Sequence, residues 1–178
     1  MKKIIECVPN FSEGRDMSII KEITNAIESV AEISLLDVDP GKATNRTVVT
    51  FVGTPDDVIE AAFRGIKRAA ELIDMRQHKG EHPRFGATDV CPLVPVANVS
   101  MDEAIEYARK LGQRVGEELG IPVFSYEFAA FKEERRSLAN CRSGEYEALK
   151  ERITTERWKP DFGPNEWNDR VAGSGATA

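Results

Sequence analysis

The chain contains 178 residues, of which 41% are hydrophobic and 30% are charged, and its formal net charge at pH 7 is −6. This composition indicates a soluble globular protein that can bury a core, because disordered chains contain fewer apolar residues and membrane proteins contain more. The negative charge argues against sequence-independent nucleic-acid binding, and the absence of a long apolar run argues against a membrane span. The N-terminus has only a short apolar run, interrupted by Glu6, so we expect a first strand rather than a signal peptide and a cytoplasmic location.

The first half of the chain alternates between strand-like and helix-like patterns. Residues 3–8 and 33–38 are short β-branched or nearly continuous apolar runs, which predict strands. Residues 16–30 carry isoleucines and a valine at three- and four-residue spacing, which predicts an amphipathic helix. Residues 39–45 have the composition of a turn and residues 46–52 form another β-branched run, so an antiparallel hairpin is predicted around the turn.

The second half begins with a helix start, where Thr54 is a candidate cap and Pro55 takes the first helical position. The elements expected after it are a helix to residue 73, a strand at 89–96, a helix at 100–119, a strand at 121–126 and a short helix at 145–153. The order of strands and helices over residues 3–96 is the split βαβ arrangement of ferredoxin-like folds. We therefore predict an α+β fold with one mixed sheet, helices packed on it, and an added helix and strand.

The C-terminal end is rich in glycine, proline and aromatic residues. Both tryptophans of the chain, Trp158 and Trp167, lie in it, which suggests that it covers or binds something. Residues 172–178 are all small, which predicts a flexible end. We therefore divide the chain into a domain over residues 1–164 and a flexible tail over residues 165–178.

One predicted loop, residues 74–89, contains both histidines of the chain, His78 and His82. Gly80 and Pro83 interrupt any helix there. Imidazole has an unperturbed pKa near neutral pH, so this loop is the first place to look for proton transfer. Loops held by a rigid scaffold often carry catalytic groups, and a polar turn is the alternative interpretation.

A metal site is a second interpretation of this loop. His78 and His82 are four residues apart, which suits two ligands on one helical face, with Glu81 or Asp89 completing the set. The glycine and proline of the loop disfavour a continuous helix, so we favour two loop histidines, one of them structural, and we expect no metal. A metal-dependent hydrolase is the lower-ranked function that the metal interpretation would imply.

The three cysteines, Cys7, Cys91 and Cys141, are odd in number and far apart, which suits neither a disulfide framework nor a zinc site. We expect reduced, buried thiols. Cys91 follows the histidines closely enough to suggest a nucleophile, but its place in a strand pattern favours a packed small hydrophobic residue.

A third interpretation makes His82 a metal-free general base, oriented by a carboxylate such as Asp39 or Asp89. Asp39 also begins an Asp-Pro-Gly sequence, so an ordinary turn residue is the alternative for it. Four cations lie on the same two loops, namely Lys42, Arg46, Lys79 and Arg84. They are either ordinary solvated charges or a pocket for carboxylates.

The motifs in and around the histidine loop resemble those of the glutamate formiminotransferases, including the formiminotransferase part of formimidoyltransferase-cyclodeaminase. The matching segments are Glu6–Gly14, Leu36–Asp39, Thr44–Thr47, Asp74–Met75, His78–Arg84, Gly86–Ala87, Asp89–Pro92, Ser143–Leu149 and Asp161–Pro164. They extend over nearly the whole chain, and the sequence His-Lys-Gly-Glu-His-Pro-Arg at 78–84 is highly specific.

The resemblance implies transfer of a formimino group from N-formimino-L-glutamate to tetrahydrofolate, in the degradation of histidine to glutamate. It implies that His82 is the catalytic base and that Asp39 assists it, with tetrahydrofolate as the acceptor substrate and no metal. The substrate-binding residues expected are Asn10, Asn45, Arg46, Lys79, Glu81, Arg84 and Asp89, and the folate-binding residues expected are Gly163, Pro164, Asn165 and Trp167. One imidazole can serve both proton transfers of this reaction, first from the attacking nitrogen and then to the leaving amine.

The resemblance also implies a partner. The family's transferase unit has two similar lobes with the substrates between them, and this chain is expected to supply the first lobe. We therefore expect a second-lobe chain or a homo-oligomer, with no nucleic acid and no membrane as partners. The alternative is a non-catalytic folate-binding or regulatory module, because residues 165–170 differ from the family text expected there.

Overall fold

The structure is a computed structural model that describes residues 1–178. The strands are β1 (Ile4–Cys7), β2 (Asn10–Phe11), β3 (Ser34–Gly41), β4 (Arg46–Gly53), β5 (Thr88–Val90) and β6 (Leu93–Ala97). The α-helices are α1 (Met17–Glu28), α2 (Pro55–Leu72), α3 (Met101–Arg114), α4 (Leu138–Cys141), α5 (Glu145–Arg152) and α6 (Asp169–Ser174). A π-helical turn, Val115–Leu119, extends α3, and two 3-10 turns, Glu127–Ala129 and Glu133–Arg136, follow it. The fold is therefore α+β, as predicted.

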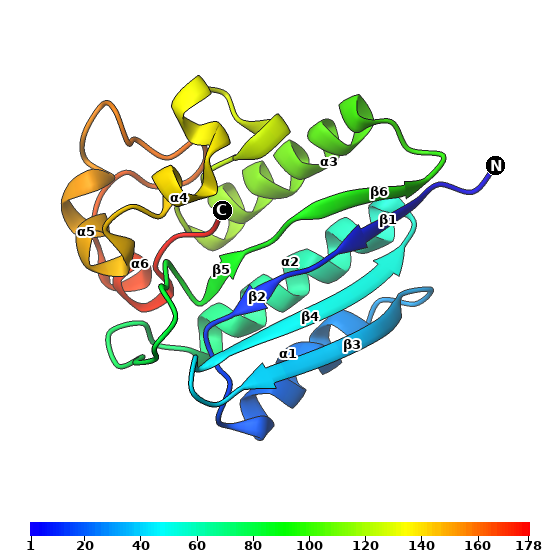
Figure 1. The fold of residues 1–178 in the computed structure, drawn as a ribbon, viewed down its shortest axis with the longest axis horizontal. Helices are drawn as coiled ribbons and strands as arrows, with labels where there is room; N and C mark the ends of the chain where they lie inside the picture. Colours follow the sequence, from blue (N-terminus) through cyan, green and yellow to red (C-terminus); the bar gives the residue numbers. More distant parts are fainter.

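The strands form one curled sheet in the order β5-β2-β4-β1-β6, with β3 paired to the outer side of β4 (Figure 1). Every strand pairing is antiparallel, so the prediction of a mixed sheet was wrong. The physical reason is that the parallel strands β1 and β3 are not neighbours, because the antiparallel strand β4 lies between them.

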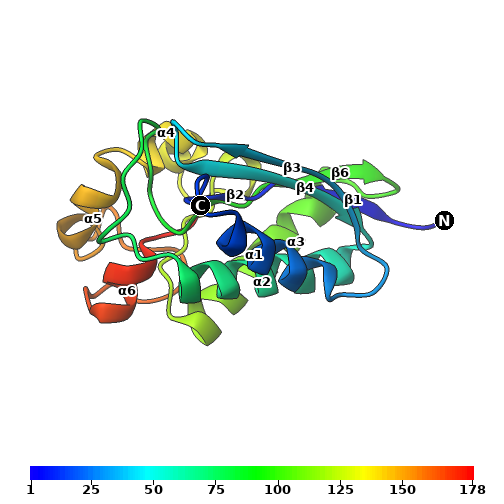
Figure 2. The same cartoon turned by 90° about the horizontal axis from the view of Figure 1, so that it is seen from below.

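Helices cover only one face of the sheet. Along β4 the side chains alternate between buried and half-buried, and Val49 and Phe51 point into the core together with Ile5 and Cys7 of β1. The amphipathic helices α1 and α2 pack against this face, and Figure 2 shows α1, α2 and α3 on the same side of the sheet. The opposite face remains open, and it carries the alternate residues of the strands.

Two proline positions interrupt the long strands. Pro9 separates β1 from β2, and Pro92 separates β5 from β6, so the expected strand at 89–96 is two short strands. Proline lacks the N–H group that a sheet ladder needs, which explains both interruptions. Pro40, by contrast, lies within β3, which is tolerated because β3 is an edge strand. The expected turn at 39–45 is correspondingly shorter, because β3 continues to Gly41.

The C-terminal part of the chain builds a second, smaller core beyond the β5 end of the sheet (Figure 1). Phe85 and Phe124 pack with their ring centroids 5.6 Å apart, and Arg135, which is fully buried, pairs with Asp161 at 2.8 Å. The segment expected as a strand at 121–126 forms only isolated bridges, through Val123. Its backbone groups bond to two different segments, at residues 161–162 and at Thr177, so no continuous ladder with one neighbouring strand forms.

Residues 165–178, predicted to be a flexible tail, are largely folded. They include helix α6, and Ala176 and Thr177 are buried. Backbone hydrogen bonds join residues 174–178 to Phe85, Ala87, Asp89, Cys91, Pro122 and Phe124. The prediction failed because it rested on small residues alone, and here small residues allow close backbone packing. None of the helices combines the length and the apolar composition that crossing a bilayer requires.

We predict that Gly175→Ala destabilises the fold, because Gly175 has a φ of +63° and an added Cβ would lie 2.5 Å from the Phe85 carbonyl oxygen. The left-handed backbone and the close contact together should cost at least about 2 kcal/mol in the free energy of unfolding. Urea unfolding followed by circular dichroism measures this loss. Gly173→Ala is the matched control, since its Cβ would meet only the Arg76 side chain at 4.0 Å. Equal stability of the two variants would contradict the prediction.

Candidate active site

The centre of the candidate site is Asp89, a fully buried carboxylate on β5. One oxygen, Oδ1, accepts a hydrogen bond from the backbone N–H of Phe85 at 2.6 Å. The other, Oδ2, accepts from the guanidinium of Arg46 at 2.9 Å and from that of Arg142. Because one carboxylate faces two guanidinium groups, the three side chains together carry one excess positive charge.

Arg46, the first residue of β4, links this carboxylate to the histidine loop. Its Nη1 lies 2.9 Å from Nδ1 of His82, and its Nε donates to Oδ1 of Asn10 at 2.9 Å. Burial lowers the pKa of the Arg46 guanidinium, and the nearby Arg142 acts in the same direction, whereas Asp89 raises it. Asp89 therefore holds a partly buried cation next to the imidazole of His82.

The His82 ring is half-buried and held at only one of its two nitrogens. Its Nδ1 lies 2.7 Å from the carbonyl oxygen of Pro83 and 2.9 Å from the Arg46 guanidinium. These contacts are alternatives, because Nδ1 must carry a proton to donate to the carbonyl and must lack one to accept from Arg46. When Nδ1–H donates to Pro83, the lone pair is on Nε2, which has no protein partner.

The second histidine has a structural place. His78 is buried, and its Nε2 lies 2.9 Å from the backbone carbonyl of Asn45, the acceptor for a protonated Nε2. Its Nδ1 is buried without a hydrogen-bond partner. Burial lowers the pKa of His78, and the Asn45 carbonyl only partly opposes that shift. His78 is therefore a neutral imidazole that supports the loop by donating a hydrogen bond from Nε2 to the Asn45 carbonyl.

Asn45 joins three segments around the site. It has a φ of +51°, its Oδ1 accepts from the Gly14 N–H at 2.9 Å, and its Nδ2 donates to the Lys79 carbonyl at 2.9 Å. Asparagine is among the few residues that adopt this left-handed conformation readily. Its side chain is occupied by these two bonds, so its geometry is that of a residue that positions the loops.

Arg84 points away from His82. Its guanidinium donates to Glu147 of α5 at 2.7 Å and to the carbonyl of His78, and it lies 5.5 Å from the Tyr146 ring. The Tyr146 ring lies 5.8 Å from that of Trp167. The structure therefore connects the histidine loop to the segment that holds the expected folate-binding residues, through Arg84 and two aromatic rings.

The remaining expected residues are more exposed. Lys79 and Glu81 extend from the loop, and Asp39 lies on the open face of β3, opposite Val48. No hydrogen bond joins the Asp39 carboxylate to His82. Gly163 has a φ of +85° and packs against the π-helical turn, whereas Pro164 is half-buried and Asn165 is exposed. The structure thus gathers Asn10, Arg46, His82 and Asp89 into one hydrogen-bonded group and leaves Asp39, Lys79 and Glu81 around it.

The residues proposed as metal ligands do not converge. His78 bonds to the backbone of Asn45, while His82 faces Arg46 and Pro83. No group of three histidine, cysteine, aspartate or glutamate side chains is arranged to hold an ion.

Arg142 is the site residue that the sequence did not reveal. It follows helix α4 and lies 53 positions from Asp89, and its side chain is only 20% exposed. No motif or periodicity marks it. The only available signal was its place immediately before the matching segment that begins at Ser143.

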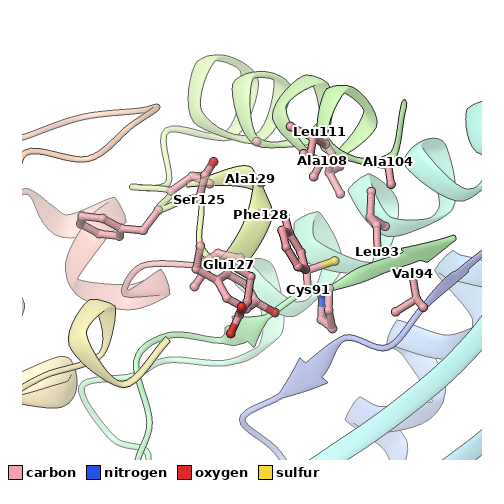
Figure 3. A pocket seen from close by; sticks show the side chains of 18 of the residues that line it. Cys91, Leu93, Val94, Ala104, Ala108, Leu111, Ser125, Glu127, Phe128 and Ala129 are labelled. Atoms are coloured by element: carbon pink, nitrogen blue, oxygen red, sulfur yellow. The ribbon is translucent and has the colours of Figure 1, made fainter. Parts of the chain in front are cut away.

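An apolar cavity of about 300 Å³ lies between β6, helix α3 and residues 123–129 (Figure 3). Its walls include Cys91, Leu93, Leu111 and Phe128, and Ala104, Ala108 and Gly112 provide a small-residue face of α3. Burial raises the pKa of Tyr126, which also lines the cavity.

Comparison with known proteins identifies the family. The family model described as "Formiminotransferase domain, N-terminal subdomain" matches residues 4–178. The chain belongs to this family. The match includes residues 165–178.

Curated relatives of this formiminotransferase subdomain are longer proteins. A formimidoyltransferase-cyclodeaminase of Dictyostelium discoideum is 56% identical over 92% of this chain and 30% of its own length. The corresponding Gallus gallus protein is 52% identical over 98% of this chain and 33% of its own length. A glutamate formimidoyltransferase of Thermoplasma acidophilum is 53% identical over 91% of this chain and 54% of its own length. The chain thus spans about a third to a half of these relatives.

We predict that Asp89→Asn strongly destabilises this formiminotransferase subdomain, because it leaves two partly buried guanidinium groups without a countercharge. Removing one member of a buried ionic group typically costs about 3 to 5 kcal/mol. Urea unfolding measures the loss. The double variant Asp89→Asn/Arg142→Gln should recover part of it, because only one cation then lacks its partner. A double variant less stable than Asp89→Asn would show that Arg142 does not depend on this carboxylate.

We also predict that the subdomain loses stability as the pH falls below about 6.5, in part through His78. The folded-state pKa of His78 lies below its ordinary value of 6.5, so the unfolded chain binds this proton more readily. The contribution is therefore present above pH 6.5 and lost below it, with a slope of at most about 1.4 kcal/mol per pH unit. Urea unfolding between pH 7.5 and 5.5 measures it. In a plot of the free energy of unfolding against pH, His78→Gln should flatten the decline below pH 6.5, whereas His82→Gln should retain it. Identical curves for His78→Gln and the wild type would contradict the prediction.

Proposed function

We propose that this chain supplies the general base for formimino transfer from N-formimino-L-glutamate to tetrahydrofolate, and that His82 is that base. The observation that carries the proposal is the arrangement of its ring: Nδ1 is held by the Pro83 carbonyl or by Arg46, while Nε2 has no protein partner. The name of the Thermoplasma acidophilum relative, glutamate formimidoyltransferase, gives the reaction class.

The proton steps follow from the chemistry of an amidine. N5 of the reduced pterin attacks the formimino carbon and must lose a proton. The bond between the formimino carbon and the glutamate nitrogen then breaks, and glutamate leaves with its α-amine free. Nε2 of His82 takes the proton from N5 and returns it to the departing amine, so the imidazole ends the cycle neutral. The Nδ1–H···O=C bond to Pro83 fixes the required tautomer and becomes stronger while the ring is an imidazolium.

The substrate carboxylates are proposed to bind to the excess positive charge around Asp89. Arg46 and Arg142 share that single carboxylate, and their side chains are 14% and 20% exposed. Lys79 adds an exposed cation on the neighbouring loop. A partly desolvated pair of guanidinium groups binds a carboxylate more strongly than free surface charges do.

Asp39 is proposed to stabilise the amidine when it becomes cationic. Its carboxylate is exposed on the open face of β3, two positions before Gly41, which lies opposite Arg46. The two side chains thus lie on the same face of the hairpin. A carboxylate without a cation partner of its own is suited to a substrate that gains positive charge.

The acceptor is proposed to approach along Gly163, Pro164, Asn165 and Trp167. Trp167 is linked to the histidine loop through Tyr146 and Arg84, which supports a position for these residues at one end of the site. Gly163 lets this segment pack closely on the chain at Ile121, because any side chain there would meet the carbonyl of Ile121.

A second lobe, from another chain or a second copy, is proposed to cover the open face. The chain spans only a third to a half of its relatives. Exposed apolar side chains at Leu36 on β3 and at Val94 and Val96 on β6 support the proposal, because a second lobe would remove them from water. We also infer a ferredoxin-like topology: if β1–β2 and β5–β6 each count as one interrupted strand, the first and third long strands are central and the second and fourth lie at the edges.

We predict that His82→Ala lowers the rate of formimino transfer by about 100-fold or more, the range typical for loss of a general base. Transfer to tetrahydrofolate is measured with the chain alone and with a second-lobe chain added. His78→Gln is the contrasting variant, because His78 supports the loop and does not face the substrate, and it should retain most of the rate. Near-wild-type turnover by His82→Ala, or a loss that follows unfolding in circular dichroism, would remove His82 from the mechanism.

A further inference from the structure

Two of the three cysteines have their sulfur atoms in contact. Sγ of Cys7, at the end of β1, lies 3.5 Å from Sγ of Cys91, in the break between β5 and β6. Cys7 is paired in register with Leu93, so Cys91 is its diagonal neighbour across the two strands. Such neighbours lie on the same face of a sheet, which here is the covered face.

The two thiols differ in access. Cys7 is completely buried, and burial raises its pKa well above the usual value. Cys91 is half-buried and lines the apolar cavity of about 300 Å³ described above (Figure 3). A small uncharged reagent that enters this cavity therefore meets Cys91 first, with Cys7 directly behind it.

The two sulfur atoms are close enough that a disulfide requires only a small movement. Forming a disulfide would bring the sulfur atoms from 3.5 Å to about 2.05 Å. The N–H of Cys91 bonds to Ala178 rather than to β2, and neither Pro9 nor Pro92 has an N–H to donate to a ladder. The Val8 N–H does donate to the Pro92 carbonyl at 3.2 Å beside the two cysteines, so the sulfur atoms must approach mainly by rotation of their own side chains.

The third cysteine provides an internal comparison. Cys141 is buried in the smaller core, where burial raises its pKa to about 11 and its thiol donates to the Arg135 carbonyl. It has no sulfur neighbour, and it does not line the cavity.

We propose that Cys91 and Cys7 form a modification site for small uncharged disulfides, at which the two thiols are reversibly converted to a disulfide. The thiolate of Cys91 attacks one sulfur of the reagent, forms a mixed disulfide and releases one thiol. The thiolate of Cys7 then attacks the sulfur of Cys91 and releases the second thiol. The reagent gains two electrons, and the protons of both cysteines leave on the two released thiols.

The test uses bis(2-hydroxyethyl) disulfide and the folded chain at pH 8. After exposure the remaining thiols are alkylated, the protein is digested with trypsin, and the peptides are mapped by mass spectrometry. We expect two of the three thiols to disappear together, with peptides 4–15 and 85–109 joined by a disulfide, and dithiothreitol to restore all three. A mixed disulfide on Cys91 that never proceeds to the linked peptides would overturn the proposal.

Single variants separate the two steps. Cys7→Ala should carry one reagent half on Cys91, Cys91→Ala should leave Cys7 at least tenfold less reactive than Cys91 in the wild type, and Cys141→Ala should behave as the wild type. Circular dichroism establishes that each variant is folded, and Cys91→Ser replaces Cys91→Ala if the latter is not. Modification of Cys7 in either Cys91 variant at the wild-type rate of Cys91 would refute the role of Cys91 as the entry thiol.

Discussion

A buried carboxylate must receive hydrogen bonds from its surroundings, and Asp89 obtains them from its own loop and from two parts of the chain that are distant in sequence. The histidine loop contributes the N–H of Phe85, β4 contributes Arg46, and the segment after α4 contributes Arg142. An isolated charge in this position would be strongly unfavourable, so the three contributors are held in place by the need to satisfy it. Arg46 in turn fixes the side of the His82 ring that faces the protein.

The two histidines illustrate how one short loop separates support from chemistry. His78 is buried, neutral and bonded to the main chain of Asn45, whereas His82 keeps one nitrogen free of protein partners. Asn45 completes the support by bonding to two further segments from a left-handed backbone. The loop is thus rigid on the side of His78 and accessible on the side of His82, which is the arrangement that a general base requires.

Local patterns were sufficient for most of the secondary structure. The isoleucine stripe of α1 and the capping box of α3, in which Ser100 and Glu103 bond reciprocally, are determined by residues close in sequence. Thr54 takes the predicted cap position of α2, although its hydroxyl bonds to the side chain of Asp57. Arg46, His82 and Asp89 each lie in a segment that carries the family resemblance, and the structure brings them together. Their catalytic roles stay predictions.

Long-range contacts account for what the sequence could not predict. Arg142 meets Asp89 only after the chain has folded back over it, and nothing in the neighbourhood of Arg142 signals this. Arg84 lies in the most specific motif and was expected to bind substrate, but Glu147 and Tyr146 draw its guanidinium toward α5. The small residues of 172–178 look like a flexible end until their backbone partners on β5 and around Phe124 are known.

The dependence of β5 on residues 174–178 has a consequence for the nascent chain. During synthesis on the ribosome, β1, β4 and the histidine loop emerge long before Arg142 and the segment that bonds to Ala87, Asp89 and Cys91. Until Arg142 leaves the exit tunnel, the Asp89 carboxylate lacks one of its two cations. Until residues 174–178 leave it, β5 and its neighbouring residues lack the backbone partners that this segment supplies. The sheet can begin to form early, but the site is completed only in the final stage of translation of this subdomain.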